Sequence, residues 1–290
     1  MTVTVNAYAK LNLFLDITGI MQNGYHYLTN VTQSVSLYDT VTITAEKNED
    51  FVYNISCDND EIPCDTSNIA YKAARVFFDA VGFEAEITID IKKRIPIMGG
   101  MGGSSVDGAA VLAGLNRIFE NPVSIDRLCT LGEKIGADVP LCLIGGTLLS
   151  DRDGIKSLNT AQNNDCYFVC VQPDFKCSTA AAYALYDRQP IEENKAVGDF
   201  LTAMTDNGTA GCAKQLYNIF AVLYADNRIR EIKDELLSIG AVGAEMTGSG
   251  SVVYGVFNDK SEAENAEIAL SNKYPRVFIC TPVKCGVAIL

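Results

Sequence analysis

A glycine-rich segment near the middle of the chain constrains its structure more than any other feature. It reads Pro96-Ile-Met-Gly-Gly-Met-Gly-Gly-Ser-Ser105 and lies between a predicted strand and a predicted helix. A loop poor in Cβ atoms lets backbone N–H groups approach a ligand closely, and the start of the following helix adds unpaired donors and partial positive charge. The segment therefore predicts a phosphate-binding loop, and a flexible surface loop is the alternative that glycine content alone allows.

Size and charge limit the possible architectures and partners. The chain has 290 residues, which favours two domains over one, and a change in residue pattern near Arg152–Ser157 predicts a division into 1–155 and 156–290. The net charge of −13 disfavours nucleic acid or an anionic membrane as the main partner, because both require a basic surface. An anionic ligand would therefore be held by local lysines and backbone dipoles.

The location of the protein and the state of its cysteines follow from what the sequence lacks. The first residues have neither the basic nor the apolar region of a secretion signal, and no segment approaches the roughly 18 apolar residues of a membrane span. We therefore expect a cytoplasmic protein. Its 10 cysteines include no Cys-x-x-Cys pair and its one histidine is His26, so we expect free, mostly buried thiols.

Hydrophobic periodicity predicts a mixed order of strands and helices, and hence an α+β protein. Strands are expected over residues 2–17, 40–46, 86–93, 166–172, 242–247, 251–257 and 276–283. Helices are expected over residues 67–81, 105–119, 125–134, 179–187, 196–205, 210–224, 228–239 and 260–272. The closing order of helix, strand, strand, helix and strand is typical of a ferredoxin-like second domain.

Three other clusters carry residues capable of chemistry. Lys10 and Asn12 lie in an otherwise apolar, alternating stretch, Asp138 lies in Gly136-Ala-Asp-Val-Pro140, and two glycines lie in Met246-Thr-Gly-Ser-Gly-Ser251. Each cluster also has a purely structural interpretation. Lys10 could face water on an edge strand, Asp138 could cap a helix, and the last segment could be an ordinary glycine hairpin.

Taken together and in this order, the four motifs resemble those of the GHMP kinases, which phosphorylate small molecules without a Walker-type loop. Within that superfamily the chain is most similar to the enzymes acting on 4-diphosphocytidyl-2-C-methyl-D-erythritol. The segments that carry this similarity are Ala9–Leu15, Asp16–Gly19, Gly24–His26 and Gly136–Pro140. The resemblance extends from residue 5 to about residue 257 and so covers both expected domains.

The resemblance implies a fold and a reaction. The expected fold has an N-terminal domain like the second domain of ribosomal protein S5, a ferredoxin-like C-terminal domain, and the active site between them. The implied reaction transfers the γ-phosphoryl group of ATP, accompanied by Mg²⁺, to the 2-hydroxyl of the cytidine diphosphate-linked substrate in non-mevalonate isoprenoid synthesis. Asp138 matches the base that accepts the hydroxyl proton, and Lys10 matches its partner, which can neutralise charge on the transferring group.

The resemblance also implies the residues that bind the two ligands. It predicts that Asn12 holds the methylerythritol hydroxyls, that Tyr25 and Tyr183 stack on the cytosine, and that His26 reads its edge. The ATP-binding residues that it predicts are Pro96, Gly99, Gly100, Met101, Gly102, Gly103, Ser104, Ser105, Val106, Gly248, Ser249 and Gly250. No direct metal ligand and no oligomeric state follow from it.

The glycine loop departs from the family pattern at two positions. Val106 stands where a second serine is expected, and Ser104 stands where a third glycine is expected. Two alternatives therefore remain open: a GHMP kinase for another small alcohol, and a nucleotide-binding regulator without catalysis. Gly24-Tyr-His26 weighs against the first alternative, and the pair of Lys10 and Asp138 weighs against the second.

Overall fold

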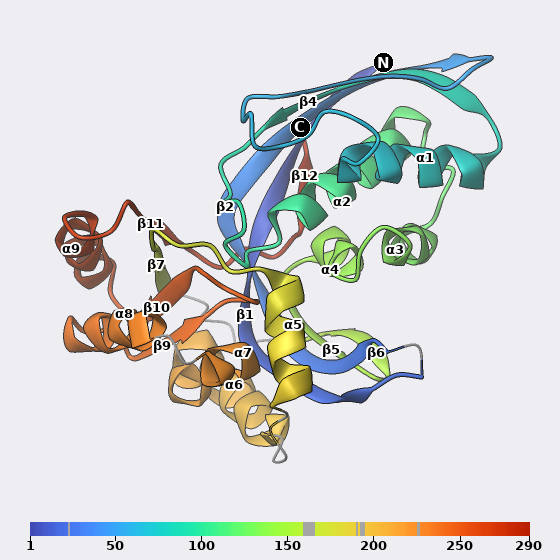
Figure 1. Cartoon of the computed structure of the whole chain (residues 1–290). Helices are drawn as coiled ribbons and strands as arrows, with labels where there is room; N and C mark the ends of the chain where they lie inside the picture. Colours follow the sequence, from blue (N-terminus) through green and yellow to red (C-terminus); the bar gives the residue numbers. More distant parts are fainter. Residues whose placement is uncertain (23, 159–165, 190, 192–194, 225–226) are drawn as a thin grey trace.

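Two β-sheets, each covered by helices, form the part of the protein that the computed structural model describes, residues 1–22, 24–158, 166–189, 191, 195–224 and 227–290 (Figure 1). The expected α+β class is confirmed. Among these described residues, no helix combines the length and the apolar character needed to cross a lipid bilayer.

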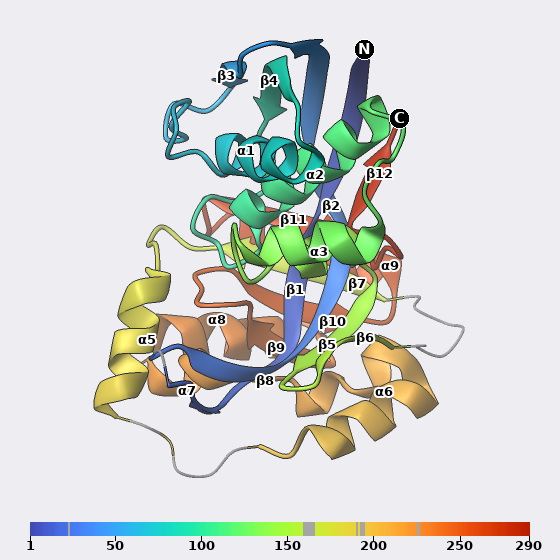
Figure 2. The same cartoon turned by 90° about the vertical axis from the view of Figure 1, so that its right-hand side faces the viewer.

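The first sheet is built on two long antiparallel strands, β1 (Thr2–Ile20) and β2 (His26–Asn48). Its order is β12-β1-β2-β4-β3, with β8 beside β1, β5 beside β2 and β6 beside β5. The remaining strands are β3 (Val52–Cys57), β4 (Glu84–Lys92), β5 (Thr147–Asp151), β6 (Gly154–Ser157), β8 (Tyr217–Asn218) and β12 (Val287–Ile289). Both termini lie at the same end of this sheet (Figures 1 and 2).

Helix α2 (Gly103–Ile118) packs across the first sheet and carries the glycine loop at its start. Small residues allow the close packing: a Cβ atom at Gly114 would lie 2.4 Å from Cδ1 of Ile43 in β2. The neighbouring helices are α1 (Ile69–Val81), α3 (Ile125–Glu133) and α4 (Val139–Ile144). The position of the glycine loop is therefore fixed by a helix that is buried along most of its length.

The second sheet has the order β11-β7-β10-β9 and is antiparallel throughout. Its strands are β7 (Tyr167–Gln172), β9 (Gly243–Met246), β10 (Val253–Phe257) and β11 (Arg276–Cys280), and it is covered by α8 (Asn227–Ser238) and α9 (Lys260–Ser271). Between β7 and α8 the chain forms α5 (Thr179–Arg188), α6 (Val197–Gly211), a 3-10 turn (Ala213–Gln215) and α7 (Ile219–Leu223). The chain order β7-α8-β9-β10-α9-β11 is ferredoxin-like, as expected.

Several expected elements differ from the structure. The helix expected over 210–224 is wrong: Asn218 interrupts it, and its side chain instead accepts a hydrogen bond from the N–H of Phe220 to cap α7. Strand β2 begins at His26, well before the expected residue 40, and β3 and β12 were not expected. A division between residues 155 and 156 would cut β6, and β8 and β12 lie in the first sheet, so the domain boundary stays a prediction.

The two sheets meet where the glycine loop touches the turn between β9 and β10. The N–H of Val252 donates to the carbonyl of Gly99 (3.2 Å), and the Thr247 hydroxyl donates to the carbonyl of Gly100 (3.2 Å). Gly100 has a φ of +77°, and a Cβ atom there would lie 2.1 Å from the Thr247 carbonyl oxygen. Gly248 makes the reciprocal contact, because a Cβ atom added to it would lie 2.7 Å from the carbonyl oxygen of Gly100. These two glycines are therefore required by the contact between the two turns.

We expect Gly100→Ala to destabilise the protein by about 2 kcal/mol or more, because the new methyl group strains a left-handed residue and also separates the two turns. Gly82→Ala is the matched control, because Gly82 has a φ of +76° but nothing within 4 Å of its would-be Cβ. Urea unfolding of both variants measures the difference. Equal losses would show that the close approach to Thr247 contributes nothing.

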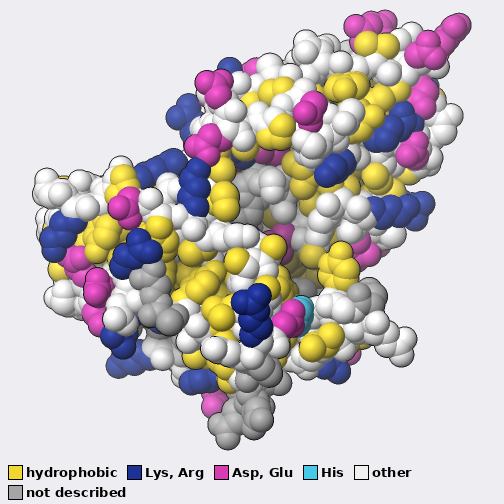
Figure 3. All heavy atoms as spheres, in the orientation of Figure 1, with side chains coloured by type: hydrophobic (Ala, Val, Ile, Leu, Met, Phe, Trp, Pro, Cys, Tyr) yellow, Lys and Arg dark blue, Asp and Glu magenta, His cyan; other side chains and the backbone are white. Residues whose placement is uncertain are grey.

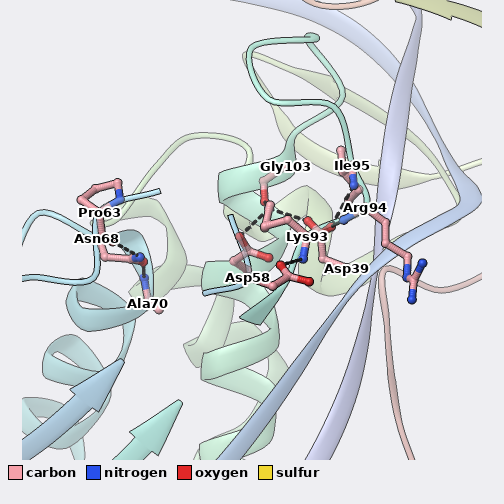
Figure 4. A network of polar contacts seen from close by, with 10 residues as sticks. Asp39, Asp58, Pro63, Asn68, Ala70, Lys93, Arg94, Ile95 and Gly103 are labelled. Atoms are coloured by element: carbon pink, nitrogen blue, oxygen red, sulfur yellow. Dashed lines mark hydrogen bonds and ion pairs between the residues drawn. The ribbon is translucent and has the colours of Figure 1, made fainter. Parts of the chain in front are cut away.

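A buried ion-pair network between β2, the end of β4 and the start of α2 supports the glycine loop (Figure 4). Lys93 follows β4, and its ammonium group donates to Asp39 (2.5 Å), to Asp107 in the first turn of α2 (2.6 Å) and to the carbonyl of Gly103 (3.0 Å). The other carboxylate oxygen of Asp39 accepts from the N–H of Ile95 (2.9 Å). The network thus joins β2, the end of β4 and the start of α2, and fixes both ends of the loop.

Burial raises the pKa of Asp107 to about 7, although Lys93 acts in the opposite direction. The native state therefore binds a proton that the unfolded state releases near the ordinary pKa of 3.8, so this group lowers stability as pH rises between these values. We expect the free energy of unfolding of Asp107→Asn to rise relative to that of the unchanged protein over this range. Urea titrations at about pH 4, 5.5 and 7 measure the difference.

Asp90→Asn is the control, because the Ser56 hydroxyl lowers the pKa of Asp90. Ionisation of Asp90 therefore increases the free energy of unfolding as pH rises, and it does so only at the acidic end of the range. A pH-independent difference for Asp107→Asn would contradict the raised pKa of the buried carboxyl.

Candidate active site

A cavity of about 1020 Å³ lies between the glycine loop, β1, the start of α4, α5 and the turn between β9 and β10. Figure 3 shows the face of the molecule that is hollowed between its upper and lower parts. Every residue that the sequence predicted for the site lines this cavity, except Val106. These residues are Lys10, Asn12, Tyr25, His26, Pro96, Gly99, Gly100, Met101, Gly102, Gly103, Ser104, Ser105, Asp138, Tyr183, Gly248, Ser249 and Gly250.

Lys10 is buried inside the first sheet, where 6% of the residue is exposed, so the interpretation as an edge lysine facing water is wrong. Its ammonium group donates to the Asn12 side-chain oxygen (2.6 Å) and to the carbonyl of Gly100 (2.9 Å). The Asp138 carboxylate lies 3.5 Å from the same nitrogen. The structure therefore brings the two predicted catalytic residues together, with the ammonium held by fixed acceptors.

Asp138 directly precedes α4 but makes no side-chain bond to the start of that helix, so capping is not its role. Its carboxylate points instead toward Lys10, and 36% of the side chain is exposed, whereas only 8% of the Lys10 side chain is. The carboxylate is thus oriented by the protein on one side and open to the cavity on the other. A group in this position can accept a proton from a ligand hydroxyl.

Asn12 connects Lys10 to Thr247, which the sequence analysis gave only as part of a glycine motif, and to Asn30, which it missed. Its side-chain oxygen also lies 3.1 Å from the Thr247 hydroxyl, whose single hydrogen is shared with the carbonyl of Gly100, and its side-chain nitrogen donates to Asn30 (2.8 Å). Asn30 lies in β2, and its proximity depends on strand pairing that periodicity does not specify. These bonds make Asn12 an anchor for Lys10, while contact of Asn12 with substrate hydroxyls stays a prediction.

The start of α2 offers the features expected of a phosphate site. Gly102 precedes the helix with a φ of +79°, and because it has no side chain, no side-chain cap satisfies the first N–H groups. Gly103, Ser104 and Ser105 follow and line the cavity. A Cβ atom on Gly102 would lie 3.2 Å from Cγ of Lys10, so this glycine also makes room for the lysine.

Val106 is placed differently from its predicted neighbours. Its side chain is fully buried in the hydrophobic core of the first domain. Its N–H donates to the carbonyl of Gly102 (2.9 Å), which begins the helical pattern. The departure from the family pattern at this position therefore puts an apolar side chain in the core and changes nothing in the lining of the cavity.

His26, at the start of β2, meets three residues of α5. Its Nε2 lies 2.8 Å from the carboxylate of Asp187, a residue that sequence reasoning missed. Its ring stacks on Tyr183 at 4.9 Å and meets the edge of Tyr186 at 5.6 Å. His26 therefore covers one face of Tyr183, whereas Tyr25 is 72% exposed at the rim.

Tyr183 lies close to the catalytic pair as well as to His26. Burial raises its pKa to about 12, and the negative charge of Asp138 adds to the shift. The cavity wall formed by α5 and the predicted catalytic residues thus line one continuous cavity.

Comparison with known proteins agrees with this geometry. A model of the GHMP kinases N terminal domain matches residues 68–146, and a model of the GHMP kinases C terminal domain matches residues 191–276. In structure, the chain is similar to a homoserine kinase from Cytophaga hutchinsonii, with a TM-score of 0.78 and 18% identity over 100% of this chain and 97% of that one. At this identity the similarity shows a shared fold alone.

Similarity to one group of these enzymes is higher. A 4-diphosphocytidyl-2-C-methyl-D-erythritol kinase from Clostridium tetani is 38% identical over 95% of this chain and 98% of its own, and that of Clostridium acetobutylicum is 37% identical over 97% and 100%. A crystal structure of a 4-(cytidine 5'-diphospho)-2C-methyl-D-erythritol kinase has a TM-score of 0.72 and 26% identity over 96% of this chain and 98% of that one. The chain therefore belongs to the GHMP kinases, and within them to the family of the 4-diphosphocytidyl-2-C-methyl-D-erythritol kinases.

Proposed function

We propose that the protein transfers the γ-phosphoryl group of ATP to the 2-hydroxyl of 4-diphosphocytidyl-2-C-methyl-D-erythritol. The observation that carries the proposal is the Lys10 ammonium, 3.5 Å from the Asp138 carboxylate, in the same cavity as the uncapped start of α2. Family membership supplies the reaction, and this arrangement supplies a base, a positive charge and a phosphate site. The alternative of a nucleotide-binding regulator without catalysis was suggested by Val106, and this residue lies in the core and does not line the cavity.

The oxygen of the substrate hydroxyl attacks the γ-phosphorus of ATP while Asp138 accepts the proton of that hydroxyl. The bond between the γ-phosphorus and the oxygen that bridges it to the β-phosphate breaks, and ADP leaves. The neighbouring ammonium of Lys10 stabilises charge on the equatorial oxygens of the transferring group. Because Lys10 is already held by Asn12 and Gly100, little reorganisation is needed when the substrates arrive. The protein therefore contributes mainly position and fixed charge.

The N–H groups at the start of α2 would hold the ATP phosphates, where the helix dipole favours negative charge. Mg²⁺ prefers oxygen ligands, and Ser104 and Ser105 at the start of α2 are among the oxygen-bearing side chains that line the cavity and would hold it. The described residues contain no group of three or more His, Cys, Asp or Glu side chains suited to a metal, so phosphates and water would supply the other ligands. When bound, the ion adds positive charge at the phosphate oxygens.

We expect Asp138→Asn to lower kcat by about a thousandfold while ATP still binds, because the amide keeps the shape of the carboxylate but accepts no proton. ADP release is measured with ATP and Mg²⁺, with and without 4-diphosphocytidyl-2-C-methyl-D-erythritol. Asp153→Asn is the control, since Asp153 is 81% exposed and lies outside the cavity. Substantial activity in Asp138→Asn would remove this residue as the base.

We expect Gly102→Val to weaken ATP binding by about tenfold or more and to lower kcat as well, because its Cβ would press on Lys10 and cover the start of α2. Gly154→Val shares the positive φ (+109°) but has nothing within 4 Å, so it controls for backbone strain. Calorimetric titration with ATP compares the two variants. Unchanged affinity in Gly102→Val would count against the phosphate site.

A further inference from the structure

We infer that Asp187 is a positioning residue that makes His26 a hydrogen-bond acceptor and thereby selects a cytosine base over uracil. The inference rests on the proposed function, because it assigns the base-reading part of the same cavity. Asp187 and His26 both line that cavity, although 161 residues separate them in the chain.

The His26 ring is held on several sides by one helix. Asp187 binds Nε2 at 2.8 Å, Tyr183 stacks on the ring with an interplanar angle of 30°, and Tyr186 meets it at 86°. These three residues share one face of α5, because their spacing of three and four residues is that of successive helical turns. Only 8% of the His26 side chain is exposed, so the ring has little freedom to turn.

The partner of Nε2 decides what Nδ1 can do. An ionised carboxylate only accepts hydrogen bonds, so Nε2 must carry the hydrogen, and in the neutral imidazole Nδ1 then carries a lone pair. An acceptor matches the exocyclic amino group of cytosine, whereas uracil presents a carbonyl oxygen at the same position, as thymine does. Asp187 therefore sets the polarity of the base contact without touching the base.

The charge of Asp187 supports a role in recognition. Its side chain is 51% exposed, and it lies in a cavity whose proposed ligands are both polyanions. A carboxylate in that place opposes the binding of a polyanion by Coulomb repulsion, so its presence there requires a compensating role. Fixing the tautomer of the chain's only histidine is such a role. The rival interpretation is a purely structural contact between β2 and α5.

The tautomer can be observed directly, because the chain has one histidine. We expect long-range ¹⁵N–¹H spectra of the ¹⁵N-histidine-labelled protein, at a pH where the ring is neutral, to show hydrogen on Nε2. In Asp187→Asn the amide can turn its NH₂ group toward Nε2, so we expect hydrogen on Nδ1 instead. Asp187→Glu should retain the original tautomer, and Asp153→Asn is the matched control.

Base selectivity is measured by titrating the same proteins with cytidine 5'-diphosphate and uridine 5'-diphosphate. We expect the protein to prefer the cytidine ligand by about tenfold or more, and Asp187→Asn to lose most of that preference. In turnover assays with the full substrate, the loss should appear in KM more than in kcat. If the contact is purely structural, Asp187→Asn should weaken the binding of both ligands equally, whatever its effect on the tautomer.

Hydrogen on Nδ1 in the unchanged protein would overturn the inference, and so would equal binding of the two diphosphates. Unaltered selectivity in Asp187→Asn would also overturn it. Absence of kinase turnover is a separate outcome, because the spectra and the diphosphate titrations require no reaction. A preference for the cytidine ligand that is lost in Asp187→Asn, without turnover in the unchanged protein, would contradict the proposed reaction and support the role of Asp187.

Discussion

The contact between the two glycine turns is the constraint on which the site depends. The carbonyl of Gly100 accepts hydrogen bonds both from the Lys10 ammonium (2.9 Å) and from the Thr247 hydroxyl of the other turn (3.2 Å). One oxygen thus fixes the predicted catalytic lysine and joins the two sheets. A shift of either turn would move Lys10 relative to Asp138, so the packing of the domains and the catalytic geometry are not independent.

The buried network below the loop has a positioning role and not a ligand-binding one. Lys93 lines the cavity and resembles a phosphate ligand, but Asp39, Asp107 and the carbonyl of Gly103 use its three donors. Two carboxylates around one ammonium also leave no net positive charge for a ligand when both are ionised. Buried ion pairs contribute little net stability after desolvation, so their effect here is to fix the geometry of the loop.

The sequence allowed prediction of the parts that follow from local rules. Clustered glycines before a helical apolar pattern predict a loop at a helix start, whereas the pairing of Lys10 with Asp138 was expected only from the family resemblance. Contacts that depend on long-range pairing were beyond such rules: Asn30 reaches Asn12 only through the register of β1 and β2, and Asp187 reaches His26 across the fold. Val106 was misplaced because the motif assigns positions along a loop, whereas the helix that begins there turns this side chain into the core.

The charge pattern of the cavity restricts how a ligand can lie in it. In a chain of net charge −13, the attraction for phosphates comes from Lys10 and from the N–H groups at the start of α2. The wall formed by α5 carries a carboxylate, Asp187, beside aromatic rings. Phosphates placed against that wall would be repelled, whereas a neutral base can stack and form hydrogen bonds there. A ligand with a base at one end and a diphosphate next to it therefore lies in one direction, with the base against α5 and with the diphosphate and the group beyond it toward Lys10 and Asp138.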